Sequence, residues 1–260
     1  MLCDLDGVVW LAHQPIPGSV DAIAALRAAG HRVLFVTNNS AARVEVQEAS
    51  LLAIGIPAEG DVLTSANAAA LLIEPGERVL VCGGEGVIQA VVGRGAFVVD
   101  GEAERADVVV VGFHRTFDYE AMLRASRAVL NGARLIGTND DATYPTPDGP
   151  IPGGGAILAS IVTASGVAPI VAGKPHEPMA ALVRTTVGEA AAKSAVMVGD
   201  RPETDGLMAQ TLGCRYAHVE SGVTAPGAAV VPVPDLVEAN LAGVAKVLIG
   251  EGIGGGSLVS

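Results

Sequence analysis

Aromatic and basic residues are both scarce in this chain. Aromatic residues make up 3% of the 260 positions, and a hydrophobic fraction of 50% comes mostly from Ala, Val, Leu and Ile. Together with 33 glycines, this mixture is typical of helices packed on parallel strands, so we expect an α/β fold. Lys and Arg number 16 against 28 Asp and Glu, a net charge of −12. Because nucleic-acid binding requires basic residues that neutralise many phosphates, we expect no nucleic-acid partner.

Cysteine is scarce as well, and long apolar runs are missing. Cys3, Cys82 and Cys214 lie far apart beside apolar residues, which excludes a disulfide framework and a cysteine metal cluster. Free thiols of this kind indicate a reducing compartment. No charged segment followed by an apolar one opens the chain, and no apolar run reaches the roughly 18 residues needed to cross a membrane. We therefore expect a soluble cytoplasmic protein with no membrane partner.

Predicted helices and strands alternate along the chain. Ile23 and Leu26 at helical spacing predict a helix over residues 19–29, and the apolar run that follows predicts a buried strand over 32–36. The same patterns predict further strands over 61–64, 78–82, 107–112, 134–138, 170–172, 194–198 and 216–219. They predict further helices over 43–53, 65–73, 119–130, 156–165, 179–187 and 236–249, and an irregular stretch over 139–155.

Two domains are expected from this order. Pro75-Gly76 ends the first series of elements, and a second α/β series begins at Arg78. The strand over 170–172 is expected to return the chain to the first domain. This predicts a parallel-sheet core made of residues 1–75 and 169–260, with an inserted α/β domain over residues 76–168.

The most informative motif is a pair of carboxylates near the start of the chain. Asp4 and Asp6 stand one residue apart where a short apolar run gives way to Gly7. Such carboxylates can bind a hard cation, and one of them can attack phosphorus. Taken alone, the pair also fits an acidic turn. Only Met1, Leu2 and Cys3 precede Asp4, so we expect either a start further upstream or a very short first strand.

Polar residues follow two further predicted strands. Thr37, Asn38 and Asn39 follow the strand over 32–36 and precede a helix whose first NH groups we expect to be free to bind phosphate oxygens. Lys174 follows the strand over 170–172, where its charge can neutralise both a carboxylate nucleophile and a phosphoryl group. We therefore predict that these four residues bind phosphate.

A second acidic cluster completes the pattern. Asp200 and Asp205 follow the strand over 194–198. Ligands of open parallel sheets bind beyond the carboxyl ends of the strands, so all these polar segments are expected to meet in one crevice. Asp4 and Asp200 are predicted to hold Mg²⁺, which prefers oxygen ligands and keeps a substrate phosphate oxygen in its shell.

In this order, the segments 4–8, 36–40, 173–175 and 199–205 resemble the four motifs of the haloacid dehalogenase (HAD) superfamily. The chain is most similar to its NagD-like phosphatases of the 4-nitrophenylphosphatase type, over essentially its whole length. This resemblance implies a Rossmann-like parallel-sheet core with an inserted α/β cap domain of the C2 type, which chooses substrates by closing over the site.

The resemblance also implies a role for each acidic residue. Asp4 would be the nucleophile that forms an aspartyl-phosphate, and Asp6 would act as general acid and base. Mg²⁺ would contact Asp4, the Asp6 carbonyl and Asp200. Asp205 would orient Asp200 or a metal-bound water from outside the ligand set.

Two segments of the predicted cap depart from the family pattern. Asn139-Asp140-Asp141 replaces an Asn-Pro-Asp sequence, and Phe113-His114-Arg115 stands where relatives have Asp-Arg after an apolar residue or Tyr. Tyr144 lies in a loop expected to face the core, where it would either bind the substrate or serve as a packing residue. His114 is expected at the surface, at the end of a strand.

We therefore predict a Mg²⁺-dependent phosphatase. Its substrate would be a small phosphorylated metabolite such as glycerol phosphate, phosphoglycolate, a nucleoside monophosphate or pyridoxal phosphate, with 4-nitrophenyl phosphate as a model ester. A phosphomutase acting on a sugar phosphate stays open, as does a non-catalytic phosphometabolite-binding protein, although the presence of Asp6 argues against the latter. The resemblance also suggests a homodimer formed through the cap.

Overall fold

The computed structural model describes residues 1–11, 13–100, 105–146, 148–224, 227 and 229–254. Its residues fall into two compact units, each of which is described by itself. The first unit comprises 1–36, 48–62 and 187–260, and the second comprises 37–47 and 63–186. Among the described residues, every helix is too short or too polar to cross a membrane.

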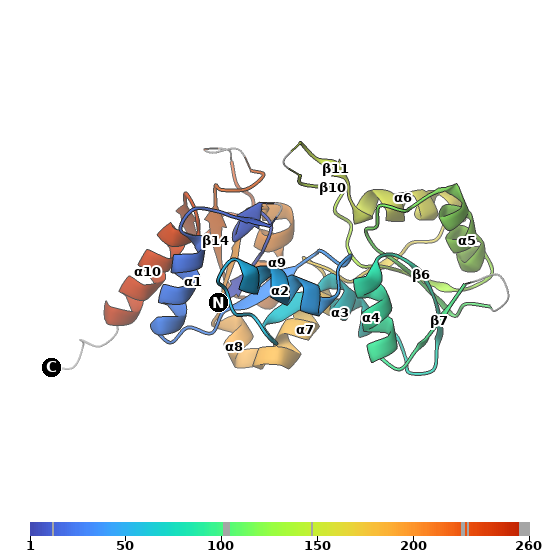
Figure 1. Ribbon diagram of the computed structural model, residues 1–260, viewed down its shortest axis with the longest axis horizontal. Coiled ribbons are helices and arrows are strands. Elements are labelled where there is room, and N and C mark those ends of the chain that lie inside the picture. The colour runs from blue at the N-terminus through green and yellow to red at the C-terminus, as the bar shows by residue number, and fades with distance from the viewer. Residues whose placement is uncertain (12, 101–104, 147, 225–226, 228, 255–260) are drawn as a thin grey trace. The chain divides into compact units, whose positions relative to one another are not determined.

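A six-stranded sheet with the order β15-β14-β13-β1-β4-β5 organises the first unit, and its strand β14 is labelled in Figure 1. The pairs β1–β13, β1–β4, β13–β14 and β14–β15 are all parallel, as predicted. The strands are β1 (Leu2–Cys3), β4 (Leu34–Thr37), β5 (Val62–Thr64), β13 (Val196–Gly199), β14 (Arg215–Val219) and β15 (Leu236–Glu238). The helices that accompany them are α1 (Ser19–Ala28), α2 (Val44–Ala53), α8 (Glu189–Lys193), the π-helix η1 (Pro202–Gly206), α9 (Leu207–Leu212) and α10 (Leu241–Gly254).

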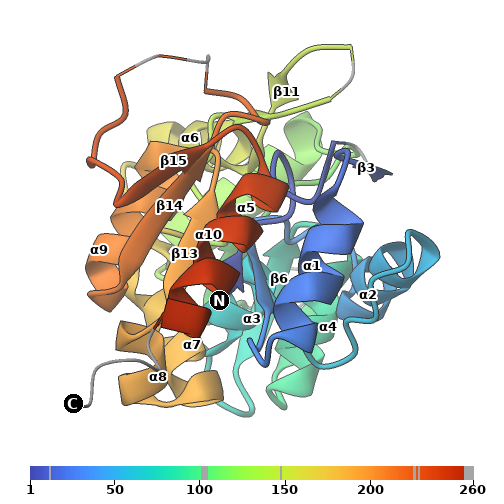
Figure 2. The ribbon, with the colours of Figure 1, turned by 90° about the vertical axis from the view of Figure 1, so that its left-hand side faces the viewer.

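Strand β1 has only two residues, in keeping with the short start of the chain. It pairs on both sides, with Cys3 opposite Val198 of β13 and Phe35 of β4. Helices α1 and α10 lie side by side (Figures 1 and 2), and Ile23 and Leu26 of α1 are buried as their spacing predicts. A central strand that is paired on both edges holds the residue after it, Asp4, in a fixed position.

A five-stranded sheet with the order β12-β9-β8-β6-β7 organises the second unit, and its strand pairs are parallel. Its strands are β6 (Arg78–Cys82), β7 (Phe97–Val99), β8 (Val108–Val111), β9 (Arg134–Gly137) and β12 (Ile170–Val171). The helices are α3 (Ser65–Ala70), α4 (Glu85–Gly93), α5 (Tyr119–Leu130), α6 (Gly154–Ser165) and α7 (Glu177–Val187). Two hairpins complete the described strands: β2 (Trp10–Leu11) with β3 (Gln14–Pro15), and β10 (Thr143–Tyr144) with β11 (Ile151–Pro152).

The second unit has a hydrophobic core of its own. The four valines of β8 are at most 1% exposed, because they point alternately to the two covered faces of a parallel sheet. Val109 and Leu135 pack in one cluster with Ile161 of α6. Each such side chain contributes about 1.5–3 kcal/mol on burial, so the sheet is a stable platform for the loops at its strand ends.

Three sequence predictions about secondary structure are wrong in detail. The helix expected over 236–249 is two elements, since residues 236–238 pair with β14 and Asn240 accepts hydrogen bonds from the NH groups of Ala242 and Gly243 at the start of α10. The stretch over 139–155, expected to be irregular, contains the β10–β11 hairpin. Ile170 and Val171 are expected to return to the first domain. They instead pair in parallel with Ile136 and Gly137, the last two residues of β9 in the second sheet.

Candidate active site

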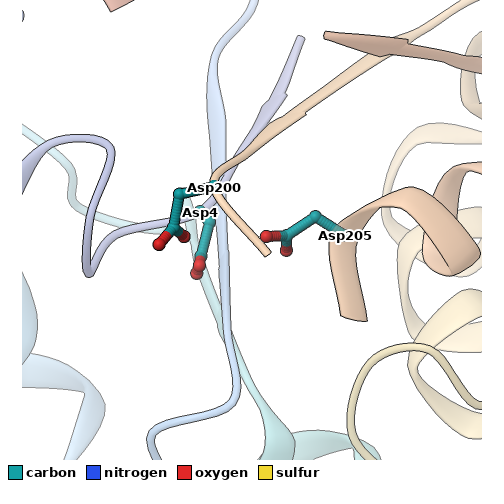
Figure 3. Close-up of side chains that lie close together, drawn as sticks. All are labelled: Asp4, Asp200 and Asp205. Carbon is teal, nitrogen blue, oxygen red and sulfur yellow. The ribbon is translucent and has the colours of Figure 1, made fainter. Parts of the chain in front are cut away.

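Three carboxylates lie together at the carboxyl edge of the first unit's sheet. The oxygens that Asp4, Asp200 and Asp205 can offer to a metal ion all lie within 4.8 Å of one another. Figure 3 shows the Asp205 carboxylate pointing toward those of Asp4 and Asp200. Asp200 is 3% exposed and Asp205 is fully buried, while Asp4 is half-buried. Like charges held this close repel one another, so a bound cation would stabilise the arrangement.

Strand pairing explains how residues so far apart in sequence meet. Asp4 follows β1 and Asp200 follows β13, which are adjacent parallel strands with Cys3 opposite Val198. The Asp4 NH group donates to the Val198 carbonyl at 2.9 Å, which continues the ladder by one residue. Asp205 is brought in by the π-helix η1, a rare helix type that is frequent at functional sites.

A loop after β14 holds Asp200. The NH group of Val223 donates to Asp200 Oδ2 at 2.8 Å, and Thr224 Oγ1 donates to the Asp200 carbonyl at 2.6 Å. Ser221 Oγ donates to the Gly7 carbonyl at 2.7 Å, which ties this loop to the turn after Asp6. These loop residues are not among the predicted site residues, although their position after another parallel strand is a usable signal.

Gly7 leaves room for the same carboxylate. Its φ is +87°, a conformation that glycine adopts at little cost, and a Cβ at this position would lie 2.5 Å from Asp200 Cγ. Asp6, directly before it, is half-buried and forms a bridge with Trp10. Its carboxylate is not part of the three-residue cluster. A different role for Asp6 from those of Asp4 and Asp200 is compatible with this position.

The second unit begins at Thr37, the last residue of β4, and it includes Asn38, Asn39 and Lys174. Asn38 and Lys174 are in contact: Asn38 Oδ1 accepts from the Lys174 NH group at 2.7 Å. Thr37 Oγ1 accepts from the NH group of Asn39 at 3.0 Å, and Asn39 Oδ1 accepts from that of Ala41 at 3.0 Å. These bonds give the segment the compact turns typical of threonine and asparagine.

The helix start after this segment differs from the prediction of free NH groups. Helix α2 begins at Val44, and the Val44 NH group donates to Gln89 Oε1 at 3.0 Å. The NH groups of Asn39 and Ala41 are likewise used within the loop. The expectation of free amides is therefore wrong at these three positions, because local side chains satisfy the donors.

Tyr144 and His114 both contact neighbouring side chains within the second unit. Tyr144 stacks on Phe113 with ring centroids 5.3 Å apart and an interplanar angle of 16°. His114 is half-buried, with Nδ1 3.1 Å from Thr116 Oγ1 and Nε2 3.7 Å from the Cys82 thiol. Burial lowers the pKa of His114 and raises the pKa of Cys82 to about 12, so both groups are neutral at pH 7.

Strand β14 carries a buried pair, Tyr216 and His218, beside the acidic cluster. The hydroxyl of Tyr216 is 2.9 Å from His218 Nδ1, and the two residues are 3% and 1% exposed. Burial raises the pKa of Tyr216, and the nearby charges of Asp205 and Asp200 raise it further, so the hydroxyl stays protonated and donates. Burial lowers the pKa of His218, so its neutral ring accepts.

This pair predicts a pH dependence of stability. His218 has a lowered pKa when folded, so the unfolded chain binds more protons below about pH 6.5, and the free energy of unfolding falls by up to about 1.4 kcal/mol per pH unit. The loss ends once pH drops below the folded pKa. His218→Asn keeps an acceptor near the Nδ1 position but cannot ionise. Urea unfolding at pH 7.5 and 5.5 should show a smaller loss for the variant; equal losses would contradict the assignment.

A parallel α/β sheet with clustered carboxylates at its carboxyl edge is typical of enzymes that use a divalent cation. Two family models match this chain: haloacid dehalogenase-like hydrolase over residues 1–96, and HAD-hydrolase-like over residues 171–244. D-glycerol 3-phosphate phosphatase of Mycobacterium tuberculosis is 37% identical over 90% of this chain and 66% of its own length. Acid sugar phosphatase of Staphylococcus saprophyticus is 35% identical over 86% of both chains.

Solved structures give the same result. The p-nitrophenyl phosphatase from Archaeoglobus fulgidus superposes with a TM-score of 0.85 at 31% identity, covering 95% of this chain and 97% of that one. Glycerol phosphate phosphatase from Mycobacterium tuberculosis, in complex with magnesium, gives a TM-score of 0.85 at 34% identity over 95% of this chain and 77% of that one. The chain belongs to the haloacid dehalogenase-like hydrolase family, and the predicted family and fold are confirmed.

Proposed function

We propose that the chain hydrolyses small phosphomonoesters through a phosphoryl group carried transiently on Asp4. The enzyme is a Mg²⁺-dependent phosphomonoester hydrolase, the class to which its glycerol phosphate, acid sugar and nitrophenyl phosphatase relatives belong. The observation that carries the proposal is the cluster of Asp4, Asp200 and Asp205 at the carboxyl edge of the sheet. A nucleophile needs such a position, because substrates of parallel α/β folds bind there.

The donor set fits Mg²⁺. Asp4 and Asp200, with the main-chain carbonyl of Asp6, would hold the ion, and Asp205 would orient Asp200. All of these donors are oxygen atoms, which is what a hard divalent cation requires. When bound, the ion offsets the negative charge of the carboxylate and the phosphate and so lets one anion approach the other.

Asp4 and Asp6 divide the chemistry between them. A carboxylate oxygen of Asp4 attacks the phosphorus atom, and the bond from phosphorus to the ester oxygen breaks. Asp6 donates a proton to the departing alcohol oxygen. In the second half of the cycle, Asp6 takes a proton from water, and this water attacks the phosphorus atom of the aspartyl-phosphate. The bond from phosphorus to Asp4 breaks, which releases phosphate, restores the Asp4 carboxylate and leaves Asp6 protonated for the next cycle.

Lys174, Thr37 and Asn39 would bind the phosphoryl group. The buried Lys174 offers positive charge where negative charge develops, and Thr37 offers a hydroxyl donor. Thr37 is the last residue of β4, and Lys174 comes three residues after β12. Tyr144 is proposed to contact the leaving group.

Residues 76–168, together with strand β12 that pairs with β9 of the same sheet, are proposed as the cap that selects the substrate. A homodimer through the cap is supported by the edge strand β7, where the side chain of Phe97 is 64% exposed. A cytoplasmic location is supported by Cys3, Cys82 and Cys214, which form no disulfide within the described part of the chain. We propose small phosphorylated metabolites as the partners, with no nucleic acid and no membrane among them.

A phosphate-release screen tests the function. Purified protein with Mg²⁺ is expected to hydrolyse glycerol phosphates, sugar phosphates, nucleoside monophosphates, phosphoglycolate, pyridoxal phosphate and 4-nitrophenyl phosphate to different extents. Ranking by kcat/KM identifies the preferred substrate, since this ratio measures discrimination. Chelation of the metal should abolish turnover. Isomerised sugar phosphate without free phosphate would instead indicate a phosphomutase, and binding without turnover would indicate a phosphometabolite-binding protein.

A further inference from the structure

The side-chain amide of Asn38 forms hydrogen bonds with both the NH group and the carbonyl of Lys174. Asn38 Oδ1 accepts from the Lys174 NH group at 2.7 Å, and Asn38 Nδ2 donates to the Lys174 carbonyl at 3.0 Å. The second Nδ2 hydrogen goes to Asp141 Oδ2 at 3.1 Å. Both N–H groups of the Asn38 amide therefore donate hydrogen bonds, and its oxygen accepts one. This pattern fixes which way round the amide group lies. Asn38 therefore has a defined structural partner at Lys174.

The main chain of Asn38 is also held by hydrogen bonds. Its carbonyl accepts from Ser65 Oγ at 2.7 Å and from Asn139 Nδ2 at 2.8 Å. Gly173 completes the contact, because a Cβ there would lie 2.5 Å from Asn38 Oδ1. The close approach of these chain segments therefore requires glycine at position 173.

The main chain of Asp141 is held by two hydrogen bonds of its own. Its NH group donates to Asn139 Oδ1 at 3.2 Å, and its carbonyl accepts from the NH group of Gly155 at 2.9 Å near the start of α6. These two bonds, one within a local turn and one to the start of α6, fix the main chain of Asp141 and so orient its carboxylate toward Asn38. A hydrogen bond from an amide to a carboxylate is stronger than one between neutral groups, so this contact orients the amide well.

We infer that Asp141 is a positioning residue, which sets the place of Lys174 in the reaction through Asn38. The inference rests on the proposed function, in which Lys174 neutralises the nucleophile and the phosphoryl group. Lys174 is 1% exposed, so its side chain is confined and follows its main chain. Displacements of about 1 Å can cost up to about 100-fold in rate. Asp141 would thereby adjust catalysis without contacting substrate.

Three variants test this role. Asp141→Ala removes the acceptor, and Asp141→Asn retains an oxygen that can accept from Asn38 Nδ2. Asp140→Ala is the matched control, because it removes the adjacent carboxylate, which is 49% exposed and pairs with His176 rather than Asn38. Two quantities are measured: steady-state hydrolysis of 4-nitrophenyl phosphate with Mg²⁺, and hydrogen exchange of the Lys174 amide by NMR.

Asp141→Ala is expected to lower kcat about tenfold while KM stays within about twofold, and to speed exchange at the Lys174 amide about tenfold. Asp141→Asn should restore both quantities to within about threefold of the parent enzyme, and Asp140→Ala should resemble the parent. A residue that touches substrate would raise KM instead. Exchange and kcat in Asp141→Ala that match those of Asp140→Ala would overturn the inference, as would an Asn variant as impaired as the Ala variant.

The two readouts separate this inference from the proposed function. Exchange at the Lys174 amide does not depend on turnover. If the parent protein hydrolyses no phosphomonoester, the proposed function fails, and the role of Asp141 in holding Lys174 is then decided by exchange alone. If the parent is active and Asp141→Ala leaves exchange unchanged, the function stands and the positioning role is refuted.

Discussion

Replacing Asp4 by Asn is expected to lower kcat by about 10⁴-fold or more while leaving the fold intact. The amide has the shape of the carboxylate but is neither an effective nucleophile toward phosphorus nor an anionic metal ligand. Asp4 is half-buried and its NH group is paired with the Val198 carbonyl, a bond that the substitution does not touch. The melting temperature without metal should therefore change by no more than about 2 °C, whereas stabilisation by Mg²⁺ should shrink.

The same substitution at Asp21 is the matched control. Asp21 is exposed in the first turn of α1, so Asp21→Asn changes the net charge equally without touching the acidic cluster. Single-turnover phosphate release and thermal unfolding with and without Mg²⁺ should distinguish the two variants. Turnover by Asp4→Asn within tenfold of the parent enzyme would mean that another group attacks phosphorus.

The acidic part of the site could be predicted because its signal is local. Asp4 and Asp200 each follow an apolar run directly, and the rule that ligands bind beyond the carboxyl ends of parallel strands does not depend on the strand order. The cluster of Asp4, Asp200 and Asp205 agrees with that expectation. The role of Asp6 and the phosphate contacts of Lys174 stay predictions, since they depend on a substrate.

The surroundings of Asn38 could not be predicted in this way. The residue was expected to bind phosphate, yet its amide contacts Lys174, 136 residues away, and Asp141, 103 residues away. Periodicity and capping patterns report on neighbours within one or two helical turns. Long-range pairs of this kind depend on how the two chain segments pack, and no single motif records them.

The prediction of one helix over residues 236–249 is wrong for a local reason. The run from Leu236 to Ile249 is apolar enough for one helix, but its first three residues complete the sheet edge against β14. Asn240 was the available signal, because asparagine is a preferred residue at helix starts and here accepts two NH groups of α10. Tertiary pairing outweighed helical periodicity over residues 236–238.

Replacing Gly222 by Ala is expected to raise the Mg²⁺ concentration for half-maximal activity by about 10- to 100-fold, the range typical of residues that orient metal ligands. An added Cβ would overlap the carboxylate of Asp200. Asp200 is 3% exposed and cannot swing outward, so the half-exposed loop must move. That movement breaks the bond from the Val223 NH group to Asp200 Oδ2, which holds the carboxylate in place.

Gly250→Ala supplies the matched control for that experiment, because nothing lies within 4 Å of a Cβ at position 250 in helix α10. It should leave Mg²⁺ dependence unchanged and stabilise the helix slightly, since alanine is the better helix former. Phosphate release titrated with Mg²⁺, together with the Mg²⁺-dependent rise in melting temperature, measures the difference. If both variants require the same Mg²⁺ concentration, the loop over residues 221–224 does not hold Asp200 in its metal-binding position. If Gly222→Ala alone requires more, a glycine that contributes no ligand atom controls metal affinity through the space it leaves for a carboxylate.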